Sequence, residues 1–248
     1  MKIHILTINI HKGFSLGNRR FILHQLREAI QTTNADIVFL QEVIGENSSL
    51  AAKHHNWPEQ AQHEFIADPD WRHFSYSKNA FYPHGHHGNA ILSRFPITAS
   101  EQVNVSTNSF EQRGFLHCIL TLPGSRLPLH CLCIHLGLFA ISRRKQIRML
   151  AAYAERYIPP EAPLIMAGDF NDWRGQCVVD FALFPGLIDA AVQASGRRAL
   201  TFPAHLPFLP LDRIYINRLQ ALKSTTYHNG IWKNLSDHAA LFVECEIQ

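Results

Sequence analysis

Charged side chains are scarce in this sequence: Asp, Glu, Lys and Arg make up 17% of its 248 residues, against roughly 25% in an average globular chain. No apolar stretch reaches the ~18 residues that a membrane-spanning helix needs. Internal repeats, low-complexity tracts and Pro/Ser-rich linkers are missing too, which excludes solenoid and disordered classes. With 46% apolar residues, we expect residues 1–248 to form a single domain around a sizeable core.

The five cysteines form no Cys-x-x-Cys pair and their number is odd. A disulfide framework is therefore excluded, and a reducing, cytoplasmic location is expected. Cys131, Cys133 and His135 alternate, so on a strand they would share one face, as metal ligands would. Residues 131 and 135 would, however, lie ~13 Å apart along a strand, whereas zinc holds its ligands at ~2.3 Å. We interpret these cysteines as buried thiols of a core strand.

Histidine is abundant: 16 occur beside 23 Lys and Arg and 20 Asp and Glu, which gives a net charge of +3 with histidine neutral. Partial protonation of histidine near neutral pH adds to this charge. The surface is therefore mildly basic and compatible with phosphorylated substrates. It lacks the dense Lys/Arg footprint of a dedicated nucleic-acid binder.

Apolar periodicity predicts strands in series with helices packed outside them. Apolar residues that recur every four positions predict a helix over residues 19–33, and Ser142 is expected to cap a second helix. Strand-like runs at residues 115–122 and 127–134 flank a Pro-Gly-Ser turn, which predicts a hairpin. Hairpins in the middle of the chain favour a mixed α/β sandwich of two sheets over a doubly wound parallel sheet.

Five short segments place a polar side chain where an apolar strand ends. They are Thr7–His11, Phe39–Val43, Gly168–Asp172, Leu211–Ile214 and Ser236–His238. Singly, each has an ordinary explanation: an Asn at a strand end often hydrogen-bonds a turn, and Asp212-Arg213 could be a surface ion pair. Their occurrence together indicates a common site.

In this order the segments resemble the endonuclease/exonuclease/phosphatase superfamily, which includes deoxyribonuclease I-like nucleases, inositol-polyphosphate phosphatases and neutral sphingomyelinases. The resemblance runs from Asn9 to His238 and includes the stretch Gly-Asn-Ala-Ile-Leu-Ser-Arg-Phe-Pro-Ile at residues 88–97. The Asn-Ile-His-Lys-Gly and His-His-Gly-Asn-Ala blocks are similar to a bacterial branch of metal-dependent hydrolases. The resemblance implies a four-layer α/β sandwich, in which two packed mixed β-sheets are flanked by helices.

The resemblance also implies a metal site. Asn9 and Glu42 would hold a divalent cation, with Asp237 nearby. Such oxygen ligands suit Mg²⁺ or Mn²⁺ better than zinc. The cation would polarise a phosphoryl oxygen and offset charge on the leaving oxygen.

The remaining roles that the resemblance implies concern the phosphate and the attacking water. His238 would carry charge or a proton at the scissile phosphate, and pairing with Asp212 should raise its pKa. Asp169 would position or deprotonate the water, and Asn171 would hydrogen-bond a phosphate oxygen. His135 would be a second phosphate contact, and which of the two histidines acts as acid or base stays open.

Other positions are weaker candidates or depart from the superfamily pattern. Arg113 is a candidate phosphate clamp. Some members carry an Asp where this chain has His11, so His11 is expected to face the phosphate instead. The acidic partner of His135 stays open between Glu64 and Asp68.

A further departure is the histidine-rich block at residues 84–87, which is not general to the superfamily. Three histidines within four residues lack the spacing of a structural zinc site. We favour a mobile substrate loop that includes His87, with zinc binding as the alternative.

These expectations define a Mg²⁺- or Mn²⁺-dependent phosphodiesterase. Its substrate would be nucleic acid, for which basic pairs such as Arg19-Arg20 could follow the phosphates, or a phospholipid head group approached through the apolar loop Phe202–Pro210. Short basic pairs on helices are, however, usually solvated surface, and for the loop we favour a rigid segment that packs on the sheet. The alternatives are an inositol-phosphate phosphatase and a non-catalytic binding module that retains the fold. The sequence does not indicate the oligomeric state.

Overall fold

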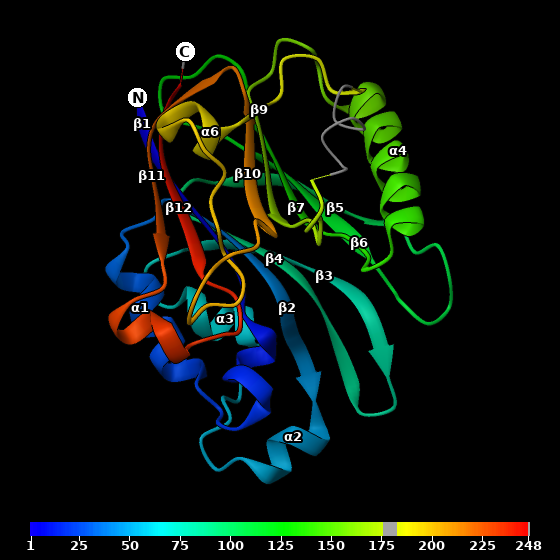
Figure 1. Ribbon diagram of the computed structural model, residues 1–248, viewed down its shortest axis with the longest axis vertical. Helices are drawn as coiled ribbons and strands as arrows, with labels where there is room; N and C mark the ends of the chain where they lie inside the picture. Colours follow the sequence, from blue (N-terminus) through cyan, green and yellow to red (C-terminus); the bar gives the residue numbers. More distant parts are fainter. Residues whose placement is uncertain (176–182, 248) are drawn as a thin grey trace.

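The computed structural model describes residues 1–175 and 183–247, whose strands form two six-stranded sheets (Figure 1). In spatial order, the first sheet contains β11 (Leu219–Tyr227), β12 (Ala240–Ile247), β1 (Lys2–Asn9), β2 (Ile37–Asn47), β4 (Gly85–Ser93) and β3 (His73–Tyr82). The second contains β5 (Ile97–Asn104), β6 (Gly114–Leu120), β7 (Leu129–His135), β8 (Leu164–Asp169), β10 (Asp212–Asn217) and β9 (Ile188–Asp189). Both sheets are mixed, because β1–β2 and β7–β8 pair in parallel and the other neighbours pair antiparallel.

Helices cover the outer faces of the two sheets (Figure 1). The helices of the described residues are α1 (Leu23–Thr32), α2 (Ser48–Lys53), α3 (Gln62–Ala67), α4 (Ala140–Tyr157), α6 (Ala190–Ser195) and the short 3-10 turns η1 (His11–Gly13), η2 (Leu16–Asn18) and η4 (Gly230–Asn234). Apolar residues of α1 and α3 pack on the first sheet, and those of α4 pack on the second. The expected four-layer α/β sandwich is thus confirmed. None of the described helices is both long and apolar enough to cross a membrane.

The largest continuous core lies between the sheets. It joins Ile5 and Phe39 of the first sheet to Cys131, Cys133 and Ile165 of the second. Burial raises the pKa of the Cys133 thiol to about 12. The interpretation of these cysteines as buried thiols is therefore confirmed, and Cys177 lies outside the described residues.

Two helix boundaries differ from the sequence expectation. The helix expected from residue 19 begins only at Leu23, because Gly17 and Asn18 adopt positive φ angles of 71° and 57° that turn the chain before it. The second helix begins at Ala140 rather than after Ser142. The side chain of Gln146 accepts the Gly137 N–H (2.8 Å), so a contact from within the helix fixes the entry in place of a serine cap.

Candidate functional site

Strand ends from both sheets meet at one end of the sandwich. Asn9 ends β1, while His135 and Asp169 end the parallel strands β7 and β8 and are direct register partners. Asp212 begins β10 and is the antiparallel register partner of Asp169. Residues far apart along the sequence are therefore brought together by strand pairing.

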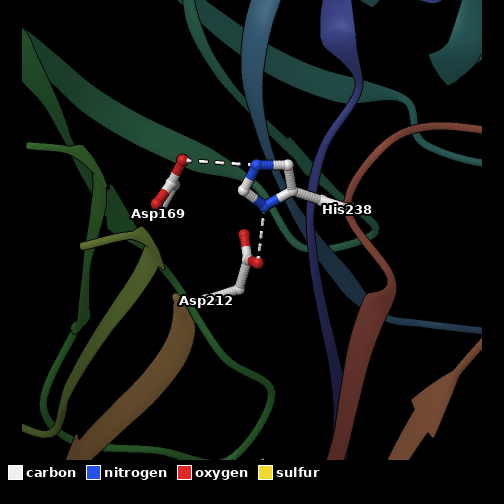
Figure 2. Close-up of side chains that lie close together, drawn as sticks. All are labelled: Asp169, Asp212 and His238. Carbon is white, nitrogen blue, oxygen red and sulfur yellow. Dashed lines mark hydrogen bonds and ion pairs between the residues drawn. The ribbon is translucent and has the colours of Figure 1, made fainter. Parts of the chain in front are cut away.

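The central contact of the site is a buried histidine between two carboxylates (Figure 2). His238 Nδ1 lies 2.8 Å from Asp212 Oδ2, and its Nε2 lies 3.8 Å from Asp169 Oδ2. Burial alone would lower the pKa of His238, but the charges of Asp212 and Asp169 outweigh it and raise the pKa to about 10. His238 is therefore an imidazolium at neutral pH, and the expected rise caused by Asp212 is confirmed in direction.

Asp169 connects this pair to the other side chains of the site. Its Oδ2 lies 3.3 Å from Asn9 Nδ2 and 3.6 Å from His135 Nε2, and its Oδ1 accepts the Asn171 N–H at 2.9 Å. Burial raises the pKa of Asp169 to about 7, against the opposing effect of His238. A carboxyl group with such a pKa can exchange a proton near neutral pH. The partner of His135 is thus Asp169, and the expected partners Glu64 and Asp68 were wrong.

Glu42 lies in a distorted part of β2. Its φ of 57° falls at a register shift between Leu40 and Val43, the geometry of a β-bulge that re-aims a side chain. Glu42 Oε1 lies 3.3 Å from Asn9 Nδ2, and its Oε2 lies 3.4 Å from Lys12 Nζ. Burial would raise the pKa of Glu42, but neighbours that include Lys12 and the hydrogen bond from Asn9 lower it to about 2, so the carboxylate is ionised.

The chemistry of these donors fits a magnesium-type ion. The ionised carboxylate of Glu42 and the carboxyl group of Asp169 supply oxygens of the kind that hard cations prefer. Asn9 lies between them and directs its Nδ2 at both, while its Oδ1 accepts the His11 N–H, so its amide would have to turn to offer an oxygen to a cation. Among the described residues, Asp169, Asp212 and His238 also form a compact group whose ligand atoms lie within 4.8 Å of one another. In this group His238 Nδ1 is hydrogen-bonded to Asp212 Oδ2 at 2.8 Å, which leaves its Nε2 facing Asp169.

Asp237 and His11, also expected at the site, contact each other. Asp237 Oδ2 lies 3.3 Å from His11 Nδ1, and the His11 N–H donates to Asn9 Oδ1 at 3.0 Å. His11 follows β1 in η1 with a φ of 45°, so it does not continue the strand face that carries Asn9. The Ser236 hydroxyl donates to the Asn9 carbonyl at 2.7 Å and so attaches this segment to β1.

Two expected phosphate contacts are engaged inside the protein. The Asn171 side-chain amide donates to the Leu136 carbonyl at 2.9 Å, and Arg113 Nε donates to the same carbonyl at 3.3 Å. Arg113 also pairs with Glu111 at 3.0 Å. In this arrangement Asn171 and Arg113 hold the chain directly after His135.

The histidine-rich block is not a loop throughout. His86 and His87 belong to β4, so the expectation of a substrate loop was wrong for them, because both pair with β2 and β3. His86 Nδ1 lies 2.9 Å from the Tyr76 hydroxyl. Burial, followed by the charge of Lys12, lowers the pKa of His87 to about 4. Among the described residues, these histidines form no metal-ligand group.

Sequence reasoning missed two polar contacts of the site. Lys12 is the cation beside Glu42, and the hydroxyl of Thr201 accepts the Asp212 N–H at 3.0 Å. Lys12 stands in the Asn-Ile-His-Lys-Gly block, which was a usable signal. Thr201 lies in no motif of the sequence, so only the fold reveals its contact.

Comparison with known proteins gives a consistent result. A family model described as the endonuclease/exonuclease/phosphatase family matches residues 6–238. An Escherichia coli K12 protein called uncharacterized protein YbhP is 45% identical over 243 residues, which cover 98% of this chain and 96% of that protein. The resemblance noted in the sequence is thereby confirmed.

Solved structures share the fold at low sequence identity. A Bacteroides vulgatus endonuclease/exonuclease/phosphatase superimposes with a TM-score of 0.78 at 15% identity and full coverage of both chains. D. rerio TDP2, complexed with a single strand DNA product, gives a TM-score of 0.69 at 19% identity, with 99% of each chain covered.

Proposed function

The chain belongs to the endonuclease/exonuclease/phosphatase family, and from this premise we propose that it is a Mg²⁺- or Mn²⁺-dependent phosphodiesterase. Members of this family are generally hydrolases of phosphoester bonds. The observation that carries the proposal is the His238 ring held between the carboxyl groups of Asp212 and Asp169, with Asn9 reaching Asp169 from the other sheet. Because the site draws on both sheets, we also propose that residues 1–248 work as one domain.

In the proposed reaction, Asp169 takes a proton from the attacking water, whose oxygen bonds to phosphorus as the ester P–O bond breaks. The proton-accepting role falls to Asp169 because His238 is already protonated and cannot serve as a base. His238, oriented by Asp212, donates from Nε2 to a phosphoryl oxygen. A metal ion bound by Glu42 and Asn9 would offset the negative charge on the phosphoryl and leaving oxygens.

The two histidines differ in this proposal. Burial, reinforced by the charge of Arg113, lowers the pKa of His135 well below its ordinary value, so His135 is neutral. A neutral imidazole offers the phosphate one hydrogen bond without charge. His238 then supplies the fixed positive charge, while Asn171 and Arg113 position the chain beside His135.

Nucleic acid is the first candidate substrate, because TDP2 of similar fold is complexed with a DNA product. A phospholipid head group is the second, because Leu206 and Phe208 are exposed on a loop whose Ala204 N–H donates to the Asp237 carbonyl at 2.7 Å. Such an apolar loop beside the site would suit an interfacial substrate.

Activity on DNA, RNA, phospholipid and inositol-phosphate diesters, with Mg²⁺ or Mn²⁺ and with chelator, tests the proposal. We expect metal-dependent hydrolysis that falls by about 10²- to 10⁴-fold in Asp169→Asn, which removes the proton acceptor. Asp68→Asn, the same change at an exposed position, is the matched control and should act like the wild type. Chelator-insensitive turnover, or unchanged turnover in Asp169→Asn, would contradict the proposal. Metal binding without hydrolysis would favour a binding module.

A further inference from the structure

A cavity of about 680 Å³ adjoins the site and takes no part in the chemistry described above. It lies between residues 15–25, η4 and the loop at Ala204 and His205. Ser236 and Asp237, which directly precede His238, form its wall toward the site. Its volume falls within the ~300–1,000 Å³ of sites that bind small organic molecules.

The cavity is strongly cationic for a chain with so few charges. Arg19, Arg20 and Lys233 line it, all three are exposed, and none of them forms an ion pair with a described residue. The single carboxylate in the lining, Asp237, faces His11 at 3.3 Å. Three permanent positive charges therefore face the opening with one partly compensated negative charge.

The lining also contains apolar side chains that are firmly packed. The Phe21 ring stacks on Trp57, with ring centres 4.8 Å apart and an interplanar angle of 21°. Ile22 and Leu235 in the same lining are buried core residues. An apolar wall beside unpaired guanidinium groups suits a phosphorylated organic group better than a bare ion.

We propose that this cavity binds a second phosphate group of the substrate, linked through an organic moiety to the scissile phosphodiester. Arg19, Arg20 and Lys233 contact that phosphate, and the moiety between the phosphates packs on Phe21. The inference rests on the proposed phosphodiesterase activity. It deepens that activity, because the preferred substrate then carries at least two phosphates, as a nucleic-acid strand or a phosphorylated inositol diester does.

A matched pair of substrates tests the proposal. Thymidine 5′-(p-nitrophenyl phosphate) carries only the scissile diester, and its 3′-phosphorylated form adds the second phosphate. We expect wild type to prefer the second substrate by about 10- to 100-fold in kcat/KM, the range for charge-assisted hydrogen bonds. The triple variant R19Q/R20Q/K233Q should lose that preference. Arg126→Gln, in the β6–β7 turn, is the control and should keep it.

Glycerophosphoinositol with and without a 4-phosphate forms a second pair, and the pair with the larger preference identifies the source of the second phosphate. No preference in either pair, or a preference that survives in the triple variant, would overturn the proposal. If neither pair is hydrolysed, the proposed activity fails. Calorimetric titration with thymidine 3′,5′-bisphosphate then tests phosphate binding in the cavity independently of activity. Binding to wild type that is lost in the triple variant supports the cavity proposal, and equal or absent binding overturns it.

Discussion

Two buried histidines of this molecule have pKa values that are shifted in opposite directions. His238 in the site and His117 on β6 are 6% and 4% exposed. Burial would lower the pKa of both, yet the pKa of His238 is raised to about 10, whereas burial and the nearby His130 lower that of His117 to about 4. The difference lies in the partners, because Asp212 and Asp169 face His238.

The His117 pair belongs to a chain of hydrogen bonds under α4 that ends at the Glu101 carboxylate. Tyr153 donates to Glu101 (2.7 Å), so its oxygen accepts from His117 Nδ1 (2.9 Å), and His117 Nε2 in turn accepts from His130 Nδ1 (2.9 Å). Each ring nitrogen of His117 has one defined role, which a second proton on His117 would disrupt. The two histidines therefore differ through their partners: two carboxylates face His238, whereas a tyrosine and a histidine face His117.

The largest expected effect is on catalytic activity, and it should differ between the two histidines. His238→Gln should lower kcat/KM on a phosphodiester by about 10²- to 10⁴-fold, because the residue that carries charge at the phosphate is lost. His117→Gln, the same change in the neutral pair, should leave kcat/KM near the wild-type value. Both would be assayed at a temperature where circular dichroism shows folded protein. Equal losses in the two variants would mean that His238 acts only through stability.

The second prediction concerns Asp212, a carboxylate that faces His238 and has no counterpart beside His117. Asp212→Asn should lower the pKa of His238 by about 1–3 units, because an adjacent opposite charge is lost. The pKa of His117 should not change, since Asp212 is not among the causes of its shift. Titration of the histidine Cε1–H resonances by NMR, with chelator present, measures both values. An unmoved His238 would assign its charge to Asp169 instead.

The third prediction concerns stability against pH. His117 has a pKa of about 4 when folded and 6.5 when unfolded, so below pH 6.5 the unfolded chain binds more protons and the free energy of unfolding falls. Between pH 8 and pH 5, His117 should account for a loss of about 2 kcal/mol.

Urea denaturation at both pH values measures this loss, and in His117→Gln it should be smaller by that amount. His238 has the opposite window. Its stabilising effect is complete below pH 6.5 and is lost as the pH rises toward about 10. An acid loss that is the same in His117→Gln and wild type would show that His117 is not neutral in the folded protein.

The smallest expected effect is on the stability contributed by an exposed histidine–carboxylate pair. His4 Nδ1 lies 3.4 Å from Asp36 Oδ2, but 36% of the His4 side chain is exposed. His4→Gln should change the free energy of unfolding by less than ~1 kcal/mol, because water screens an exposed pair. Urea denaturation at pH 6 measures the change. A loss well above ~1 kcal/mol would show that exposure to water does not weaken such a pair.

The layers of the fold and the residues of the site could be predicted from the sequence. The contacts between those residues could be predicted much less completely. Alternation around Cys131 and Cys133 and the Pro-Gly-Ser turn sufficed for the β6–β7 hairpin, because these signals are local. The helix starts at Leu23 and Ala140 depend on backbone turns and on Gln146, which periodicity does not encode.

For the site, the motifs predicted Asp169, Asp212 and His238, but not which groups would meet. The His135–Asp169 contact follows from the parallel register of β7 and β8, which no local pattern specifies. Asn171 was expected at the phosphate, but its amide donates to the Leu136 carbonyl. Hydrogen bonds between segments distant in sequence explain both differences.

The position of β12 between β1 and β11 has a consequence for the order of assembly. Residues 240–247 pair with residues 2–7, so strands from opposite ends of the described sequence must find each other. His238 lies two residues before β12, and its partner Asp212 belongs to the other sheet. Such distant pairings slow folding, since the chain between them must first be closed into a loop. A ribosome-bound chain that ends before residue 240 lacks β12, and with it the strand pairing that attaches the His238 segment to β1.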